Sequence, residues 1–253
     1  MKYEVRAMSF GEILDTGFRL VTNHFVLLFG IGAMLYVPLA LIGAAMAAAP
    51  GLDGTSMAII GVVWLVTLVL SPVVTGAMTF ALGEVYLGRE VTVGGALRTG
   101  LSLVSGLVGT GLLATVLIVL GMIALLVPGI YLILAYVLLT PVMVFERTFG
   151  TRALGRSKAL MKGNFGRAIG ILLLTGIISG ITGWSMNLVL GAVPLLAPVG
   201  SAIVQTLVAS YSAAVVALLY FDIRSRKEAF DIEHLAQAVE ADVPRAPLPS
   251  PAI

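Results

Sequence analysis

The sequence predicts an all-α, polytopic integral membrane protein with six transmembrane helices and three amphipathic helices on the cytoplasmic side. Composition is the first observation behind this prediction: 59% of the 253 residues are hydrophobic and 11% are charged, whereas an ordinary soluble domain has about 25% charged residues. The mean hydropathy of +1.06 is also far above the soluble range. This composition excludes an ordinary water-soluble enzyme, a disordered protein and a nucleic-acid-binding protein, so we expect no nucleic-acid partner.

Six apolar stretches are long enough, or nearly so, to cross a bilayer core of about 30 Å, which needs about 20 helical residues. They are Phe25–Ala48, Met57–Phe80, Leu107–Val127, Ile130–Phe145, Ala168–Leu190 and Val199–Phe221. The fourth stretch is short, and only the tight turn Val127-Pro128-Gly129 joins it to the third. A re-entrant pair of helices is the alternative at this place. A second alternative is signal-peptide cleavage after the first stretch, in the small-residue run Ala44–Ala49.

The placement of the cations predicts the orientation. All 15 Lys and Arg residues lie at the N-terminus, after the second or fourth stretch, or in the C-terminal tail. The opposite loops are Ala49–Ser56, Val127–Gly129 and Gly191–Pro198, and Asp53 is their one charged residue. The positive-inside rule therefore places both termini in the cytoplasm. We expect a multi-pass protein of a prokaryotic cytoplasmic (inner) membrane.

The sequence offers no residues for metal, thiol or cofactor chemistry. It has no cysteine, and neither His24 nor His234 has a partner at metal-ligand spacing. Charged residues in the middle of a membrane span usually mark function, but none is present, because Glu84, Glu146 and Asp222 all lie near span ends. We therefore expect no catalytic residues, no metal site, no cofactor and no enzymatic activity, and the pattern weighs against an ion-coupled transporter.

An amphipathic segment precedes the first span. Its apolar residues form one helical stripe: Phe10, Ile13, Leu14, Gly17, Phe18 and Val21. Ser9 and Glu12 are spaced as a capping box, and Met8 and Ile13 as a hydrophobic staple. A helix of this kind is expected to lie flat at the cytoplasmic leaflet.

The same pattern recurs twice. A second stripe follows Thr92, which is placed as a helix cap, and contains Val93, Ala96, Leu97, Gly100, Leu101 and Val104. A third copy matches Leu14 and Leu20 with Leu154 and Leu160, but has Ser157 where the first has Gly17. The spans add a resemblance between the segments around Pro72 and Pro141, and both prolines are expected to kink their helices.

The sequence thus favours a single membrane domain over residues 1–240, built from a threefold parallel repeat. The units are about 9–88, 92–149 and 150–222, each an interfacial helix followed by a membrane hairpin. Chance recurrence of amphipathic and apolar segments is the alternative. A cytoplasmic C-terminal segment, 223–240, and a proline-rich tail, 241–253, follow, and the tail is expected to be disordered.

Two sets of side chains are candidate functional residues. The third amphipathic segment is the most basic and offers lipid-headgroup candidates, namely Arg152, Arg156, Lys158, Lys162 and Arg167. Near an anionic leaflet each cation contributes about 1 kcal/mol, although ordinary positive-inside anchoring explains them as well. The second set is a polar path formed by Thr67, Ser71, Thr75, Asn187 and Gln205. These residues indicate either a pore or hydrogen bonding between helices, which averages about 0.6 kcal/mol per contact.

The C-terminal segment carries a dense charged motif: Asp222, Arg224, Arg226, Glu228 and Asp231. Asp222 and Arg226 are spaced to pair, and such a pair contributes little when it is exposed. Asp231 is placed to cap a separate short helix.

Three segments resemble a known family. The opening segment runs from Ser9–Asp15 on to Tyr36-Val37-Pro38, and the middle segment runs from Thr140-Pro141 through Arg156-Ser157 to Phe165. The closing segment is the Asp222–Asp231 motif, in which Ala229 stands where glycine is expected. They resemble the membrane domain of glycerophosphoryl diester phosphodiesterases. Six spans and three interfacial helices leave no room for the phosphodiesterase barrel, so the resemblance implies a stand-alone membrane domain without hydrolase residues.

The leading hypothesis is a non-enzymatic integral membrane protein that organises lipids or partner proteins at the cytoplasmic leaflet. Membrane lipids with anionic headgroups are the expected partners, and membrane shaping or scaffolding through homo-oligomers is the expected mode. The alternative is a channel or passive transporter for a small or lipidic solute. An intramembrane enzyme is a third hypothesis, for which the spans show no nucleophile–base pair.

Overall fold

The computed structural model describes residues 8–47, 54–191 and 197–242, which form helices and no strand within those ranges. The helices are α1 (Phe10–Asn23), α2 (Phe25–Ala47), α3 (Gly54–Tyr86), α4 (Val93–Ser102), α5 (Val104–Ala124), α6 (Leu126–Ala135), α7 (Leu139–Phe145), α8 (Gly150–Met161), α9 (Phe165–Gly191) and α10 (Ala197–Asp242). Six segments are long and apolar enough to cross a membrane, with α6 and α7 together forming the fourth. The predicted all-α class is confirmed, and so is the prediction of six helical segments with the length and composition of membrane spans.

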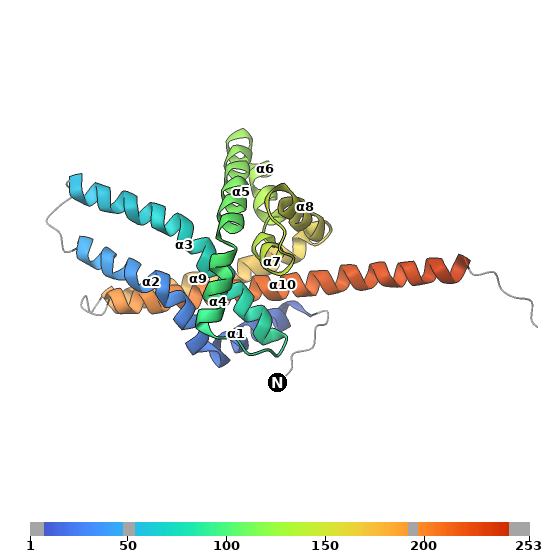
Figure 1. Cartoon of the computed structure of the whole chain (residues 1–253), viewed down its shortest axis with the longest axis horizontal. Helices are drawn as coiled ribbons and strands as arrows, with labels where there is room; N and C mark the ends of the chain where they lie inside the picture. The colour runs from blue at the N-terminus through green and yellow to red at the C-terminus, as the bar shows by residue number, and fades with distance from the viewer. Residues whose placement is uncertain (1–7, 48–53, 192–196, 243–253) are drawn as a thin grey trace, which may run out of the picture.

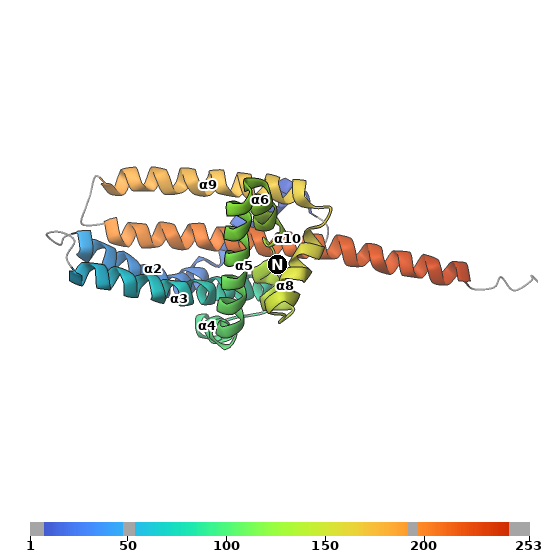
Figure 2. The ribbon, with the colours of Figure 1, turned by 90° about the horizontal axis from the view of Figure 1, so that it is seen from above.

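The hairpins α2–α3 and α9–α10 lie side by side and project in the same direction (Figures 1 and 2). Helix α10 is the central element, because it contacts α1, α2, α3, α7, α8 and α9. It then continues past the bundle as one helix to Asp242. Asp231 therefore lies inside a continuous helix, and the prediction that it caps a separate short helix is wrong.

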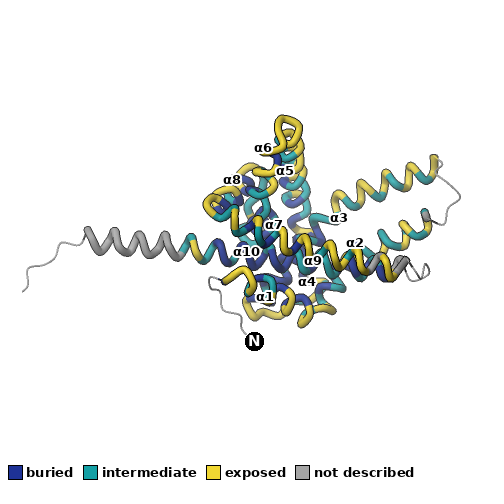
Figure 3. Tube along the Cα trace, turned by 180° about the vertical axis from the view of Figure 1, so that it is seen from behind, coloured by how far each residue is buried: buried dark blue, intermediate teal, exposed yellow. Residues whose placement is uncertain are grey.

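The hairpin α5–α6 runs across the direction of α9 and α10 in both views (Figures 1 and 2). Many of its apolar side chains are exposed, among them Val116, Ile123 and Val127 (Figure 3). The predicted repeat has three hairpins with the same direction, and the middle hairpin differs from the other two. The re-entrant alternative for this pair therefore stays open.

The turn of this hairpin lies two residues earlier than predicted. Leu125, in extended conformation, separates α5 from α6, and Pro128 lies in the first turn of α6. Proline is tolerated there because the first backbone N–H groups of a helix have no partner within the helix. Glycines allow the two helices to approach closely, since a Cβ on Gly121 would lie 3.2 Å from the Cα of Gly129.

The two span prolines have different surroundings. Helix α3 continues through Pro72 without interruption. The fourth span is broken at residues 136–138, just before the short helix that contains Pro141. At this break the hydroxyl of Ser157 donates a 2.8 Å hydrogen bond to the backbone oxygen of Ala135. Ser157, which replaces the glycine of the first stripe, therefore donates to the Ala135 carbonyl group next to the break at residues 136–138.

The amphipathic helices begin where the caps predict. Both bonds of the capping box form in α1: the Ser9 N–H donates to Glu12 Oε2 at 2.6 Å, and the Glu12 N–H donates to Ser9 Oγ at 3.3 Å. In α4 the hydroxyl of Thr92 accepts from the Gly95 N–H at 3.2 Å. These local predictions are confirmed.

The buried part of each stripe packs against the protein instead of facing lipid. Helix α1 packs on α10, α4 on α3, and α8 on α5, α6 and α7. A small residue lies at each crossing: Gly17 faces Val215, Gly100 faces Val73, and Ser157 bonds to α6. In the predicted repeat, α4 of the second unit therefore contacts the second span of the first unit, and α8 of the third unit contacts the second span of the second unit. Helix α1 of the first unit contacts the second span of the third unit, α10. The threefold repeat stays a prediction, and these contacts are the ones that a closed ring of three units would make.

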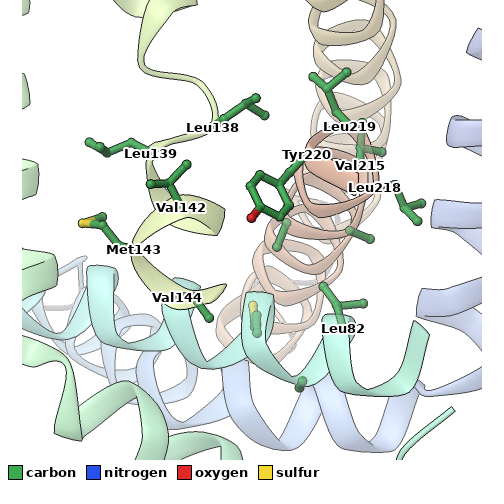
Figure 4. Close-up of a cluster of buried hydrophobic side chains, with 14 of the residues drawn as sticks. Leu82, Leu138, Leu139, Val142, Met143, Val144, Val215, Leu218, Leu219 and Tyr220 are labelled. Atoms are coloured by element: carbon green, nitrogen blue, oxygen red, sulfur yellow. The ribbon is translucent and has the colours of Figure 1, made fainter. Parts of the chain in front are cut away.

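The core lies where α3, α7 and α10 meet. Leu82, Val142 and Leu218, one from each helix, are buried together there (Figure 4). Phe221 of α10 stacks on Tyr86 of α3 with ring centroids 5.4 Å apart and lies 5.1 Å from Phe145 of α7. Aromatic pairs at such distances add about 0.5–1.5 kcal/mol each to burial, so this contact helps to hold α3, α7 and α10 together.

An alanine at Gly100 is expected to destabilise the protein, because its Cβ would lie 2.6 Å from the backbone oxygen of Val73. Overpacking of this kind costs about 1–3 kcal/mol and should lower the thermal-unfolding temperature in detergent. Gly94 of the same helix is the matched control, because nothing lies within 4 Å of its added Cβ. Gly94→Ala should leave that temperature unchanged or raise it. Equal unfolding temperatures for the two variants would contradict the close α3–α4 contact.

Candidate functional site

A buried carboxylate organises the charged end of the bundle. Asp222 of α10 is 0% exposed. Its Oδ1 accepts from the backbone N–H of Met8 at 2.7 Å and from Arg226 Nε at 3.0 Å, while Oδ2 lies 2.9 Å from Arg167 Nε of α9. Both guanidinium groups also donate to the backbone oxygen of Met8. We call Met8, Arg167, Asp222 and Arg226 the Asp222 junction.

The sequence predicts an Asp222–Arg226 pair, and the pair forms, but its expected exposure is wrong. The physical reason is that Met8 and Arg167 come from distant parts of the chain and cover the carboxylate, which residue spacing within one helix does not reveal. A buried carboxylate needs such partners, because an uncompensated charge in the interior is strongly unfavourable. Arg167 is also a lipid-headgroup candidate in the sequence, and the structure directs its guanidinium to the protein.

A second network lies beside the junction. Glu146, at the end of α7, accepts from Arg156 Nε at 2.8 Å and from the Tyr220 hydroxyl at 3.0 Å. Arg156 Nη2 also donates to Glu228 at 3.0 Å, and Arg224 donates to Glu228 at 2.8 Å. The hydrogen bonds to Glu146 raise the pKa of Arg156 above its ordinary value, so its guanidinium stays charged.

These two networks border a partly polar cavity of about 580 Å³ between α8, the turn that follows it and α10. Its lining, which we call the basic pocket, consists of Arg156, Ala159, Leu160, Gly163, Asn164, Arg226, Lys227 and Glu228. The ammonium group of Lys227 donates to the backbone oxygens of Ala159 and Lys162 at 2.5 and 2.9 Å. The cation thus satisfies carbonyl groups at the C-terminal end of α8, where positive charge is favourable.

The pocket has the chemistry of an anion site. Three of its side chains are cationic and one is a carboxylate. Among the described residues, the hydrogen bonds of Arg156 and Arg226 given above use Nε and Nη2, and none of them uses Nη1. Guanidinium groups bind phosphate and carboxylate oxygens well because their donors are planar and fixed.

The structure separates the five basic residues that the sequence groups together. Arg156 lines the pocket, and Arg167 belongs to the Asp222 junction. Arg152, Lys158 and Lys162 are exposed on or next to α8, and the ammonium group of Lys158 lies 5.6 Å from the Tyr131 ring centroid. Asn164 and Lys227 are pocket residues that the sequence did not indicate. Lys227 lies between Arg226 and Glu228 of the dense C-terminal motif, and this position was the sequence feature that could have indicated it.

The residues of the predicted polar path have different surroundings. Thr67, Ser71 and Thr75 are half-buried on α3, and Gln205 is exposed on α10. The side chain of Asn187 lies outside the described residues. None of the four described side chains lines the basic pocket. The neighbouring Thr79 hydroxyl donates to the backbone oxygen of Thr75 at 2.8 Å, which is a bond within one helix.

Within the described ranges, no group of three His, Asp or Glu side chains is arranged to hold a metal ion. The fold and its six apolar spans define an all-α, multi-pass integral membrane protein.

A family model described as "Domain of unknown function (DUF8558)" matches residues 95–244, which is more than half of the chain. The chain therefore belongs to this family. The matched range runs from α4 to the end of α10 and includes every residue of the basic pocket. No curated protein and no solved structure matches the chain.

Replacement of Asp222 by asparagine is expected to destabilise the fold strongly. It leaves Arg167 and Arg226 close together without their shared counter-charge, and breaking a buried pair in this way costs about 3–5 kcal/mol. Thermal unfolding in detergent measures the loss.

The matched control is Glu84→Gln, which removes a carboxylate from the pair with Arg89, where the distance is 3.3 Å and Arg89 is 66% exposed. This change is expected to cost less than about 1 kcal/mol. A loss at Asp222 no larger than the loss at Glu84 would show that the junction is not a structural anchor.

Proposed function

We propose that this protein is a non-enzymatic integral membrane protein that organises lipids at the cytoplasmic leaflet by binding anionic phospholipid headgroups in the basic pocket. The observation that supports the proposal is the pocket itself, in which Arg156, Arg226 and Lys227 border one cavity of about 580 Å³. A lipid phosphate is an anion of the kind that two guanidinium groups and an ammonium group bind together.

The position of the pocket supports lipid over a soluble anion. It lies at the ends of two candidate spans, between the start of α9 and the charged part of α10. The charge distribution predicts that this end is cytoplasmic, where anionic lipids attract basic segments by about 1 kcal/mol per cation. The exposed Arg152, Lys158 and Lys162 add positive charge on the adjoining helix α8 and its end.

The sequence resemblance fits the same proposal. The opening, middle and closing segments of the chain resemble the membrane domain of glycerophosphoryl diester phosphodiesterases. A relative of this membrane domain would keep contact with the glycerophospholipid layer without hydrolysing it. We therefore propose that the protein belongs among such membrane domains in role, as a lipid-binding module and not as an enzyme.

Lys227→Gln tests the proposal, because glutamine keeps a donor for the α8 carbonyl groups but removes the charge from the pocket. In reconstituted protein, native mass spectrometry with phosphatidylglycerol and phosphatidylcholine measures the preference for the anionic lipid. We expect the preference to fall about fivefold, which corresponds to about 1 kcal/mol.

Arg152→Gln is the matched control, since it removes one exposed cation from α8 that does not line the pocket. It should change the preference by less than twofold. A wild-type protein without preference for phosphatidylglycerol, or equal effects of the two variants, would overturn the proposal. Preference for free inorganic phosphate over the lipid would reassign the pocket to a soluble anion and would also contradict it.

A further inference from the structure

The α5–α6 hairpin presents an apolar face that the described helices leave exposed. The chain has no charged residue from Thr99 to Phe145. On α5 the exposed side chains Leu112, Val116, Val119 and Ile123 follow one another at intervals of three or four residues, so they share one face of the helix. We call this face the α5 stripe. A contiguous apolar surface of this kind marks contact with a membrane or with another protein.

The exposure of α3 indicates how deep in the membrane the hairpin begins. The exposed large apolar side chains of α3 lie between Met57 and Val69, whereas the helix is mostly buried in protein from Val73 to Tyr86. At about 1.5 Å per residue, the stretch 54–70 is about 25 Å long, which is close to the bilayer core of about 30 Å. The lipid-facing part of α3 therefore ends near Val73.

The hairpin begins at this level and does not follow the long spans. A Cβ on Gly76 of α3 would lie 2.8 Å from Leu107 Cδ1, so the start of α5 packs beside the end of the lipid-facing part. From there the hairpin runs across the direction of α9 and α10 (Figures 1 and 2). Helix α8, with its exposed cations Arg152 and Lys158, lies on the side of the hairpin opposite to α2 and α3 (Figures 1 and 3). An interfacial segment has this position, with charge on one side and hydrocarbon on the other.

The returning helix of the hairpin is too short to cross a bilayer. Helix α6 has 10 residues, and its length of about 15 Å is about half of the bilayer core. Beyond the break at residues 136–138, α7 packs against α3, α8 and α10, and its side chains Leu139, Val142 and Met143 are buried. Helix α7 therefore does not extend α6 through lipid.

We propose that the α5–α6 hairpin does not cross the bilayer but lies parallel to it in the cytoplasmic leaflet, with the α5 stripe against the acyl chains. The cytoplasmic side follows from the one-sided placement of the cations. Helices α2, α3, α9 and α10 then supply four crossing segments, an even number that keeps both termini on the same side. A hairpin inserted in one leaflet displaces lipid there and not in the opposite leaflet, so its insertion is sensitive to membrane curvature. This surface is separate from the basic pocket and does not depend on it.

Quenching of a fluorophore by lipids that carry spin labels at different depths tests this placement. The chain has no cysteine, so each single-cysteine variant takes one fluorophore. Val116→Cys and Ile123→Cys report two positions of the α5 stripe, and we expect both fluorophores at nearly the same depth, between the bilayer centre and the headgroups. Val62→Cys and Val69→Cys, at exposed sites of α3 with the same spacing, are the matched control, and their depths should differ by about 10 Å.

A difference of about 10 Å between Val116→Cys and Ile123→Cys as well would show that α5 crosses the bilayer, and would overturn the proposal. Two fluorophores on the α5 stripe that the lipids fail to quench would also overturn it, because a second copy of the chain or another protein would then cover the stripe.

Labelling of intact cells with a membrane-impermeant maleimide gives an independent measurement. Added from outside, the reagent should react with Thr55→Cys, at the exposed start of α3, but not with Val127→Cys, at the tip of the hairpin, where the side chain is 76% exposed. Reaction of Val127→Cys as fast as that of Thr55→Cys would place the tip on the far side of the membrane and contradict the proposal.

Discussion

The burial of Asp222 is the constraint on which the charged end of the molecule depends. A carboxylate that is 0% exposed at the end of a membrane span is tolerated only with compensating charge and hydrogen bonds. Met8, Arg167 and Arg226 supply them from three separate parts of the chain. The segment before α1, the start of α9 and the charged part of α10 are therefore fixed relative to one another by one side chain.

Several other features follow from this arrangement. Because α1 is anchored beside Asp222, Gly17 can pack closely against Val215, and α1 contacts both α9 and α10. Arg226 directs two of its nitrogens to the junction, while its side chain also borders the basic pocket. Helix α10 thus takes part in both the Asp222 junction and the basic pocket. The buried residues of the amphipathic stripes serve this packing, whereas Phe10, Phe18 and Leu101 of the same stripes are exposed.

What the sequence predicts well is local. Apolar stretches give the spans because the bilayer sets their length, and caps such as Ser9 and Thr92 satisfy N–H groups of their own helices. The one-sided cations and the small residues at Gly17 and Gly100 are equally visible in the sequence. The break before Pro141 and the turn at Leu125 lie close to their predicted places but differ in detail, because several breaker residues compete there and packing selects among them.

What the sequence does not predict is which distant residues meet. Arg167 appears as one more basic residue of a lipid-facing segment, and only the packing of α9 on α10 turns it towards Asp222. Lys227 and Asn164 form one pocket across a separation of more than 60 residues. The direction of the α5–α6 hairpin likewise depends on its contacts with other helices, such as those of α5 with α3 and α8. Hydropathy does not predict this direction, because it is the same whether the hairpin runs along the other hairpins or across them.

The most direct test of the central role of Asp222 is a double-mutant cycle between Arg167 and Asp222, measured by unfolding in detergent for Arg167→Met, Asp222→Leu and the double variant. Each single variant leaves a charge without its partner, whereas the double variant removes both. If the junction anchors the fold, the double variant should be less destabilised than the sum of the single variants by about 1.5 kcal/mol or more, within the range for interacting neighbours. Additive losses would show that the two side chains act independently, and would contradict the central role of the buried carboxylate.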